Sequence, residues 1–302
     1  MKTLLGPCPQ YQLEPFAYPE LWDITDNMVA NTWTPEEKGV GPDTATYRRL
    51  QASQDRTDQS KLHLFNTLWG QLTAMDQQRS EDATIYFLLF FMPEEVKHFL
   101  IRLMWEERLH THAYRYVVRS FGLPETGPDS IYDLWKTVPA LKARVEYAEK
   151  ISRTVEDWWT YVKHNALVSE EYPLALKEDL YVALVFWFMI FEKVWFLINL
   201  SGPLQHMART QPAGGQAEFE GAAKQLYYIA RDEYQHILGG SHIIKHYMKE
   251  NPEVINERTA KRIQVMYDEC LVLELDFINE CLKVSPILGY HPADHLETAQ
   301  YF

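Results

Sequence analysis

Two pairs of a glutamate and a histidine, each spaced three residues apart, could bind metal ions. They are Glu107 with His110 and Glu233 with His236. Positions i and i+3 lie on one face of a helix, so each pair can present a carboxylate oxygen and an imidazole nitrogen to one point. The spacing alone is weak evidence, because residues 95–98 repeat it in the first turn of a helix, where a solvated capping role explains it.

Two further carboxylates belong with these pairs. Glu192 lies in the most apolar segment of the chain, residues 181–200. An ionised carboxylate in such surroundings needs a partner. The neighbouring Lys193 points about 100° away around a helix, which favours a metal ion as the partner. Asp76 ends an apolar helical stripe and offers a fourth carboxylate.

The combined set contains four carboxylates and two imidazoles from four expected helices: Asp76, Glu107, His110, Glu192, Glu233 and His236. It is the ligand set of a ferritin-like dimetal carboxylate bundle, with an aspartate in place of one glutamate. Oxygen-rich sites with two nitrogen ligands suit iron or manganese better than zinc thiolate chemistry. Tyr114 follows one helical turn after His110 and could lie beside the ions, although a buried tyrosine is usually just part of the core.

Long helices must position these side chains. Apolar residues recur mostly at helical spacing, and strand-like alternation is scarce. We therefore expect an all-α fold, a ferritin-like helical bundle with a dimetal carboxylate site in a four-helix core. The segment Ser201–Gly221 is expected to be a loop because of its prolines and glycines. Long helices are expected at about 58–78, 93–121, 136–165, 176–199, 217–248 and 252–283.

The chain is expected to form one large domain with an extension at each end. No linker rich in proline, glycine or serine divides its 302 residues. Residues 1–35 are expected to form an irregular arm with a short helix near its end. Residues 36–285 form the expected bundle, and residues 286–302 an expected flexible, polar tail without sustained periodicity.

Composition and charge exclude several functions. Forty-two acidic and 29 basic residues give a formal charge of -13, which disfavours nucleic acid and anionic membranes as partners. Cys8, Cys270 and Cys281 show no metal or disulfide pattern, which favours the reducing cytoplasm, and no export signal is evident. Residues 181–200 are long enough to span a membrane, but Glu192 and Lys193 at their centre favour a buried helix of a soluble bundle.

Four segments together resemble the small, radical-generating subunit of class I ribonucleotide reductase. WTPEE at 33–37 resembles the N-terminal motif of that family, and LTAMD at 72–76 its first ligand segment. EERLHTHAY at 106–114 resembles the ligand motif that ends in the radical tyrosine, and IARDEYQH at 229–236 the second Glu-x-x-His signature. The resemblance runs from about Trp33 to past His236, and the combination of motifs is highly specific.

The resemblance implies a role for each metal ligand. Asp76, Glu107 and His110 would hold one ion. Glu192, Glu233 and His236 would hold the other, with Glu107 and Glu233 bridging. The metal pair would be di-iron, di-manganese or mixed.

The resemblance also implies a radical site. Tyr114 would be oxidised to a tyrosyl radical after the reduced metals react with dioxygen. Asp232 would bond to His110 and connect it to Trp33, which begins the relay. An apolar pocket would protect the radical, with Leu200 at a position where the family often has phenylalanine: Phe196, Leu200 and Ile229.

The implied partner is a separate large subunit, in which ribonucleotides are reduced to deoxyribonucleotides for DNA synthesis. The tail would dock there and carry a relay tyrosine, Tyr290 in preference to Tyr301. A homodimer is the family expectation, and a manganese form can depend on a flavoprotein that supplies oxidant. The alternative in the same fold is a ligand-binding or substrate-oxidising dimetal oxidase, against which Trp33, Asp76, Tyr114 and the aromatic tail argue.

Overall fold

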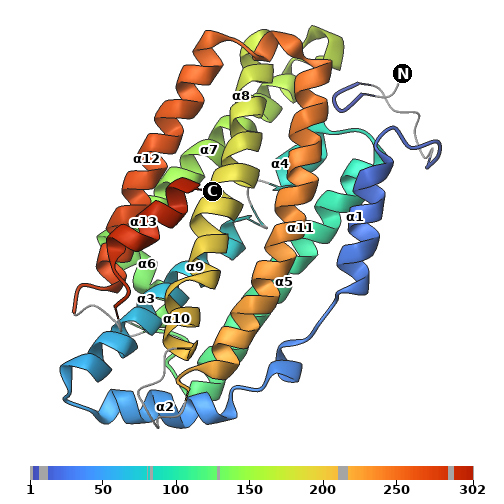
Figure 1. Ribbon diagram of the computed structural model, residues 1–302. Helices are drawn as coiled ribbons and strands as arrows, with labels where there is room; N and C mark the ends of the chain where they lie inside the picture. The colour runs from blue at the N-terminus through green and yellow to red at the C-terminus, as the bar shows by residue number, and fades with distance from the viewer. Residues whose placement is uncertain are drawn as a thin grey trace.

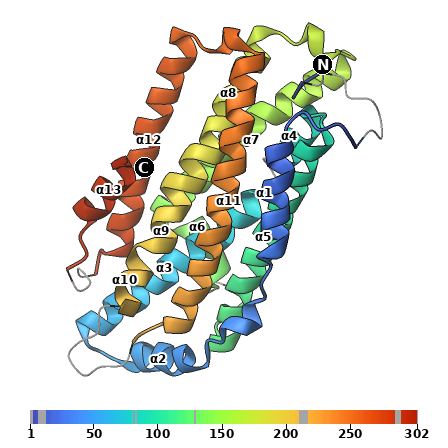
Figure 2. The same cartoon turned by 45° about the vertical axis from the view of Figure 1, so that its right-hand side comes forward.

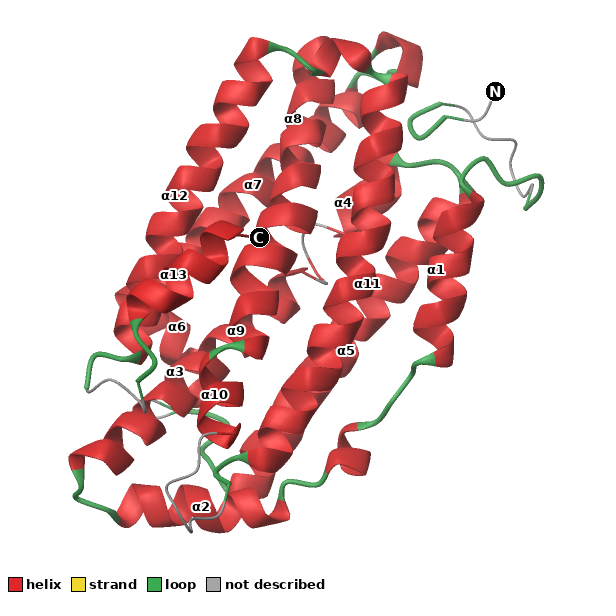
Figure 3. Cartoon of the chain, in the orientation of Figure 1, coloured by secondary structure: helices red, strands yellow, loops and turns green. Residues whose placement is uncertain are grey.

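The computed structural model describes residues 3–6, 13–79, 81, 84–127, 130–209, 217–284 and 289–301. Apart from an isolated bridge at Tyr290, the regular elements in these ranges are helices (Figure 3), which confirms the predicted all-α fold. The α-helices are α1 Pro19–Ala30, α2 Gly41–Ala52, α3 Arg56–Gln78, α4 Thr84–Phe90, α5 Glu94–Phe121, α6 Leu134–Thr137, α7 Pro139–His164, α8 Leu174–Val185, α9 Ile198–Ser201, α10 Pro203–Arg209, α11 Glu220–Glu250, α12 Glu257–Cys281 and α13 Pro292–Tyr301. A π-helix, η5 Phe186–Leu197, joins α8 to α9, and the 3-10 turns are η1 Pro35–Lys38, η3 Ile131–Asp133, η4 Ser169–Glu171 and η6 Pro252–Val254.

Four long rods form the core of the bundle. They are α3, α5, α11 and the continuous run of α8, η5 and α9, and α11 packs against both η5 and α5. Figures 1 and 2 show α5 and α11 side by side from both directions, with α12 on the side of the bundle away from α1. The site residues expected from the sequence lie on these rods.

Local signals in the sequence explain where the core helices begin and end. The Asp55 side chain caps α3 by accepting hydrogen bonds from the backbone amides of Thr57, at 2.8 Å, and Asp58, at 3.2 Å. Helix α5 ends at Gly122, whose φ of 71° is a left-handed conformation that glycine adopts without strain. The starts and ends of both helices lie close to the predicted positions.

Two consecutive glycines allow α11 to approach its neighbours closely. A Cβ atom on Gly239 would lie 2.3 Å from the Phe99 ring, and one on Gly240 would lie 2.1 Å from the Phe188 ring. Larger residues at these positions would push α11 away from α5 or η5. The glycines therefore help to set the spacing of the helices that carry the site.

Helix α1, in the segment expected to form an irregular arm, packs against the bundle. Leu21, Ile24 and Met28 follow helical spacing on α1 and are at most 6% exposed. They bury α1 against α5 and α11. The expected short helix is present, but its apolar face belongs to the common core.

Three expected segments differ in detail. The expected helix over 136–165 is broken at Val138, because a residue before proline disfavours helical torsions and Pro139 starts α7. The expected loop Ser201–Gly221 contains α10, and the expected irregular tail contains α13. Cys8, the junction of bundle and tail at residues 285–288, and Phe302 lie outside the described residues.

The apolar rod Leu174–Arg209 is, among the described helices, the one long and apolar enough to cross a membrane. Of its most apolar window, 72% is buried inside the bundle. This burial agrees with the prediction of a core helix.

Candidate metal centre

The six predicted ligands converge from the four core rods. Asp76 comes from α3, Glu107 and His110 from α5, Glu192 from η5, and Glu233 and His236 from α11. Each is at most 1% exposed. They form two groups, within each of which one ligand atom per residue lies within 4.8 Å of the others: Asp76, Glu107, His110 and Glu233, and Glu107, Glu192, Glu233 and His236.

The two groups share Glu107 and Glu233, the two carboxylates that the family resemblance implies as bridges. His110 Nδ1 lies 3.4 Å from Glu107 Oε2 and 3.3 Å from Glu233 Oε1. His236 Nδ1 lies 3.5 Å from Glu107 Oε1 and 2.7 Å from Glu233 Oε2. Asp76 approaches His110 Nδ1 to 3.6 Å on the outer side of the first group.

The ligand atoms lack hydrogen-bond partners among the described residues. Apart from the ion-pair contacts that they make with one another, both oxygens of Asp76, Glu107 and Glu233, one oxygen of Glu192, and Nδ1 of each histidine are buried without a hydrogen bond. Buried polar atoms normally have partners, so such a concentration requires an explanation. Four carboxylates and two imidazole nitrogens directed at one another fit a pair of divalent ions, which would neutralise the four negative charges.

The electrostatics of the cluster favour cations. Burial raises the pKa of Asp76, Glu107 and Glu192, and neighbouring carboxylates raise it further. Burial opposes charge on His110, but Glu233 and Asp232 outweigh it and raise its pKa well above the ordinary value. Without metal ions the cluster therefore retains protons that bound ions would replace.

The first outer contact links His110 to Trp33. Trp33 Nε1 donates to Asp232 Oδ2 at 2.7 Å, and the same oxygen lies 3.4 Å from His110 Nε2. Burial raises the pKa of Asp232, but bonds from His110, Trp33 and Arg231 outweigh it and keep the pKa below its ordinary value. A charged carboxylate thus lies between the expected relay tryptophan and a ligand imidazole.

A second outer contact was not predicted. His236 Nε2 lies 3.0 Å from Glu106 Oε2, and Arg102 Nη2 donates to Glu106 Oε1 at 2.8 Å. Arg102 also donates to the Met28 carbonyl at the end of α1. The doublet Glu106–Glu107 was the available signal, because a second buried glutamate beside a ligand needs its own partner.

Arg79 was also missed. Its Nε donates to Glu192 Oε1 at 2.7 Å, with both side chains buried. The guanidinium lies over the rings of Trp187 and Phe188, at 5.2 and 4.7 Å from their centres. The sequence predicted a metal ion as the partner of Glu192, but the structure shows that Glu192 also has a protein partner, Arg79. The signal in the sequence was the i+3 spacing of Arg79 from Asp76, which places both on one helix face.

Tyr114 is fully buried beside Asp76. Burial raises the pKa of its phenol, and the charge of Asp76 raises it further. The Trp69 ring packs edge-on against Tyr114 at 5.6 Å. The three expected pocket residues are at most 1% exposed and lie on η5, α9 and α11: Phe196, Leu200 and Ile229.

Tyr290 is held by the body of the protein. Its hydroxyl lies 2.7 Å from His295 Nδ1, and His295 Nε2 lies 2.6 Å from Glu274 Oε1 on α12. Arg144 Nη2 pairs with the other Glu274 oxygen at 3.1 Å, and this pair is fully buried. The expected flexible tail is therefore anchored here, because His295 supplies a buried polar link that the expectation of flexibility overlooked. Tyr301 lies at the end of α13.

The core rods and their carboxylate and histidine cluster define a ferritin-like protein of the dimetal carboxylate class. The sequence profile of the ribonucleotide reductase small chain matches residues 10–301. The chain belongs to this family of oxidoreductase subunits.

A curated relative carries the name of the same family, and solved structures share the fold. The ribonucleoside-diphosphate reductase subunit beta of Chlamydia pneumoniae is 24% identical over 278 residues, 92% of this chain and 73% of that protein. The ribonucleotide reductase R2 subunit from Clostridium botulinum has a TM-score of 0.77 at 20% identity, covering 99% of this chain and 84% of that one. An R2-like ligand-binding oxidase with a Mn/Fe cofactor has a TM-score of 0.68 at 15% identity, covering 93% and 90%.

Proposed function

We propose that this chain generates and exports a tyrosyl radical as the small subunit of a ribonucleotide reductase. Two ions of iron or manganese would be held in the cluster, with Glu107 and Glu233 between them. Such a redox-active pair supplies the oxidising power to remove an electron from Tyr114. Support comes from the family assignment and from the buried ligand atoms that lack hydrogen bonds.

The neighbours of Tyr114 give it the chemistry for this role. A phenol whose pKa is raised by burial loses its proton only together with its electron. Asp76 adjoins the phenol and its charge raises the phenol's pKa further, so the proton would leave towards the metal cluster. Phe196, Leu200 and Ile229 contribute buried apolar surface to the same core, which would keep water from the radical.

The path out of the core is proposed to begin at Trp33. The observation that carries this proposal is the contact of Trp33 with Asp232 and of Asp232 with His110. A radical-exporting subunit needs such a connection from its cluster towards the surface. The large subunit, a second copy of this chain and, for a manganese form, an activating flavoprotein are the proposed partners. Buried free thiols at Cys270 and Cys281 favour the cytoplasm as location.

The decisive test is the electron paramagnetic resonance spectrum of Tyr114→Phe. Wild-type protein loaded with ferrous or manganous ion and exposed to oxidant should show a tyrosyl signal. The variant should lose this signal and keep its metal content, because Tyr114 is proposed as the radical site and not as a ligand. An unchanged signal in the variant would place the radical on another residue.

The relay is tested by Asp232→Asn, which removes the charge and preserves the size of the side chain. We expect unchanged metal content and an unchanged tyrosyl signal, with nucleotide reduction by the large subunit reduced by roughly tenfold or more, in the range found for outer partners of metal ligands. Asp268→Asn is the matched control, because it makes the same change at an exposed position on α12. Full turnover in Asp232→Asn would remove Asp232 from the path.

A dimetal oxidase that acts on a bound organic molecule is the second candidate, favoured by the similarity to the R2-like ligand-binding oxidase. It predicts an organic ligand that purifies with the protein and no activity gained from a large subunit. Mass spectrometry of the purified protein, together with nucleotide reduction in the presence of a large subunit, separates the two functions.

A further inference from the structure

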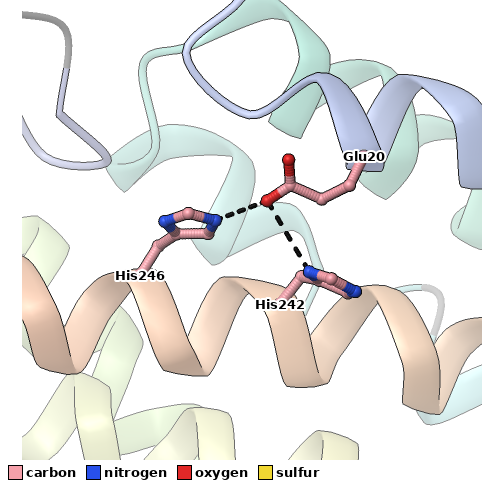
Figure 4. A group of neighbouring side chains, drawn as sticks. All are labelled: Glu20, His242 and His246. Carbon is pink, nitrogen blue, oxygen red and sulfur yellow. Dashed lines mark hydrogen bonds and ion pairs between the residues drawn. The ribbon is translucent and has the colours of Figure 1, made fainter.

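Outside the buried cluster, a second group of metal-binding side chains connects α1 to α11. His242 and His246 are four residues apart on α11, so they share one face of that helix. Glu20 in the first turn of α1 extends towards both rings (Figure 4). One ligand atom from each of the three side chains lies within 4.8 Å of the others.

Both imidazoles face the same carboxylate oxygen. His242 Nδ1 lies 3.6 Å from Glu20 Oε1, and His246 Nε2 is in direct contact with that oxygen (Figure 4). A simple ion pair would need one histidine. Two ring nitrogens and one carboxylate oxygen directed at one point instead provide three ligands of a tetrahedral site, with the fourth position open.

The surrounding contacts hold this geometry in place. The Tyr18 ring packs edge-on against His246, with ring centres 4.6 Å apart. The Tyr18 hydroxyl bonds to Glu250, one turn further along α11, and the Leu4 amide donates to the other Glu250 oxygen at 2.8 Å. These contacts fix the chain before Glu20, and the packing of α1 against α5 and α11 fixes the chain after it, so binding an ion would order few additional groups.

Exposure and charge suit a hydrated divalent ion. The side chains of Glu20, His242 and His246 are 30%, 31% and 28% exposed, so an ion can enter from solvent and keep a water ligand. Burial raises the pKa of Glu20, but its own backbone amide and the two histidines outweigh it, so Glu20 is a carboxylate at neutral pH. Two nitrogen ligands favour zinc, cobalt or nickel over magnesium or calcium.

We propose that Glu20, His242 and His246 form a separate, partly exposed binding site for a divalent transition-metal ion of the zinc type. The bound ion would cross-link α1 to α11. Helix α1 leads to Trp33, and α11 carries its partner Asp232, so the ion would fix two elements that meet at that contact. The proposal does not depend on which metals or which reaction the buried cluster supports.

Equilibrium dialysis tests the site with Zn²⁺ alone as the probe. Full-length protein is first loaded with iron or manganese and its metal content measured. Dialysis against a series of Zn²⁺ concentrations should add one zinc per chain without loss of the loaded metals. In His246→Ala and His242→Ala the apparent zinc affinity should fall at least tenfold, while the loaded metals remain.

His164→Ala is the matched control, because it removes an exposed histidine at the end of α7 and should leave zinc binding unchanged. His246→Gln provides a variant that can still bond to Glu20 if His246→Ala fails to fold. As a second measurement, Co²⁺ should produce visible absorption bands in wild-type protein that are lost in His242→Ala. No added zinc, zinc taken up only by displacing the loaded metals, or equal zinc affinity in the folded histidine variants would each overturn the proposal.

Discussion

A buried positive charge lies beside the candidate metal centre at Arg79. The guanidinium donates one hydrogen bond to Glu192, and its two terminal nitrogens have no hydrogen-bond partner among the described residues. The guanidinium therefore balances part of the negative charge of the cluster. It would also repel a cation bound at Glu192. Coulomb's law makes this repulsion several kcal/mol for a nearby divalent ion even at an effective dielectric constant of about 20.

Arg79→Met tests this opposition by removing the charge at similar length. We expect the affinity for the second ion to rise by roughly tenfold or more, because a like charge is removed. The metal-free protein should lose about 1–2 kcal/mol of stability from the missing buried hydrogen bond, because the raised pKa of Glu192 lets this side chain hold a proton instead of a charge. Calorimetric metal titration and thermal unfolding measure the two effects. Weaker metal binding would instead mean that Arg79 holds Glu192 in a productive position.

Arg108→Met is the matched control for Arg79→Met, because Arg108 pairs with Glu81 at the surface, where both side chains are about half exposed. Surface pairs contribute little to stability, so both measurements should stay near the wild-type values.

At the residue scale, helical spacing predicted which side chains gather in the candidate metal centre. Glu107 with His110, and Glu233 with His236, each share a helix face, and the structure brings both pairs together with Asp76 and Glu192. Their outer partners were harder to predict. Arg79 and Glu106 contact side chains on other core rods. The spacing of residues within one helix does not predict which helix packs against it.

The tail was expected to be flexible, but its helix α13 is connected to the bundle. Tyr290 and His295 connect it to Glu274, which is already paired with Arg144. For Tyr290 to relay a radical to a large subunit, this connection would have to open. His295 is the link on which the connection depends.

His295→Ala should release the tail and leave the pair of Arg144 and Glu274 intact. We expect faster cleavage by a protease between α12 and α13, together with a loss of roughly 1–3 kcal/mol from the missing buried hydrogen bonds. His291→Ala is the matched control, because His291 is exposed and immediately precedes the same helix. Equal cleavage rates in the two variants would show that other contacts hold α13.

At the element scale, the long helices were predictable and two details were not. The apolar run through Glu192 indicates a helix, but the pattern does not distinguish the α-helical from the π-helical turns of η5. Helix α13 is short and polar, with His295 and Ala299 as its fully buried contacts, so its periodicity is too brief to recognise.

The whole molecule is proposed to work only with a partner, and the tail is the proposed contact. Deleting residues 286–302 should leave the tyrosyl signal of Tyr114 intact, because the six metal ligands lie outside this segment. Nucleotide reduction with the large subunit should be abolished. Normal turnover by the truncated chain would show that docking uses another surface.

The helical bundle could be predicted from the sequence, because helical periodicity indicates the fold class. The composition gives the net charge of -13. The packing of the two ends of the chain against the bundle could not be predicted from the sequence. Leu21 and Met28 bury α1 in the same core as the central rods, and this requires knowledge of which faces meet.

The distribution of the ligands along the chain has a consequence for stability. They come from Asp76 through His236, so bound ions would close loops that contain more than half of the chain. Closing a long loop removes conformations from the unfolded state and thereby stabilises the folded one. Cys270 and Cys281 are free thiols, so no disulfide among the described residues does this work. Metal loading would then raise the unfolding temperature of the protein, so a loaded chain would resist unfolding better than a metal-free one.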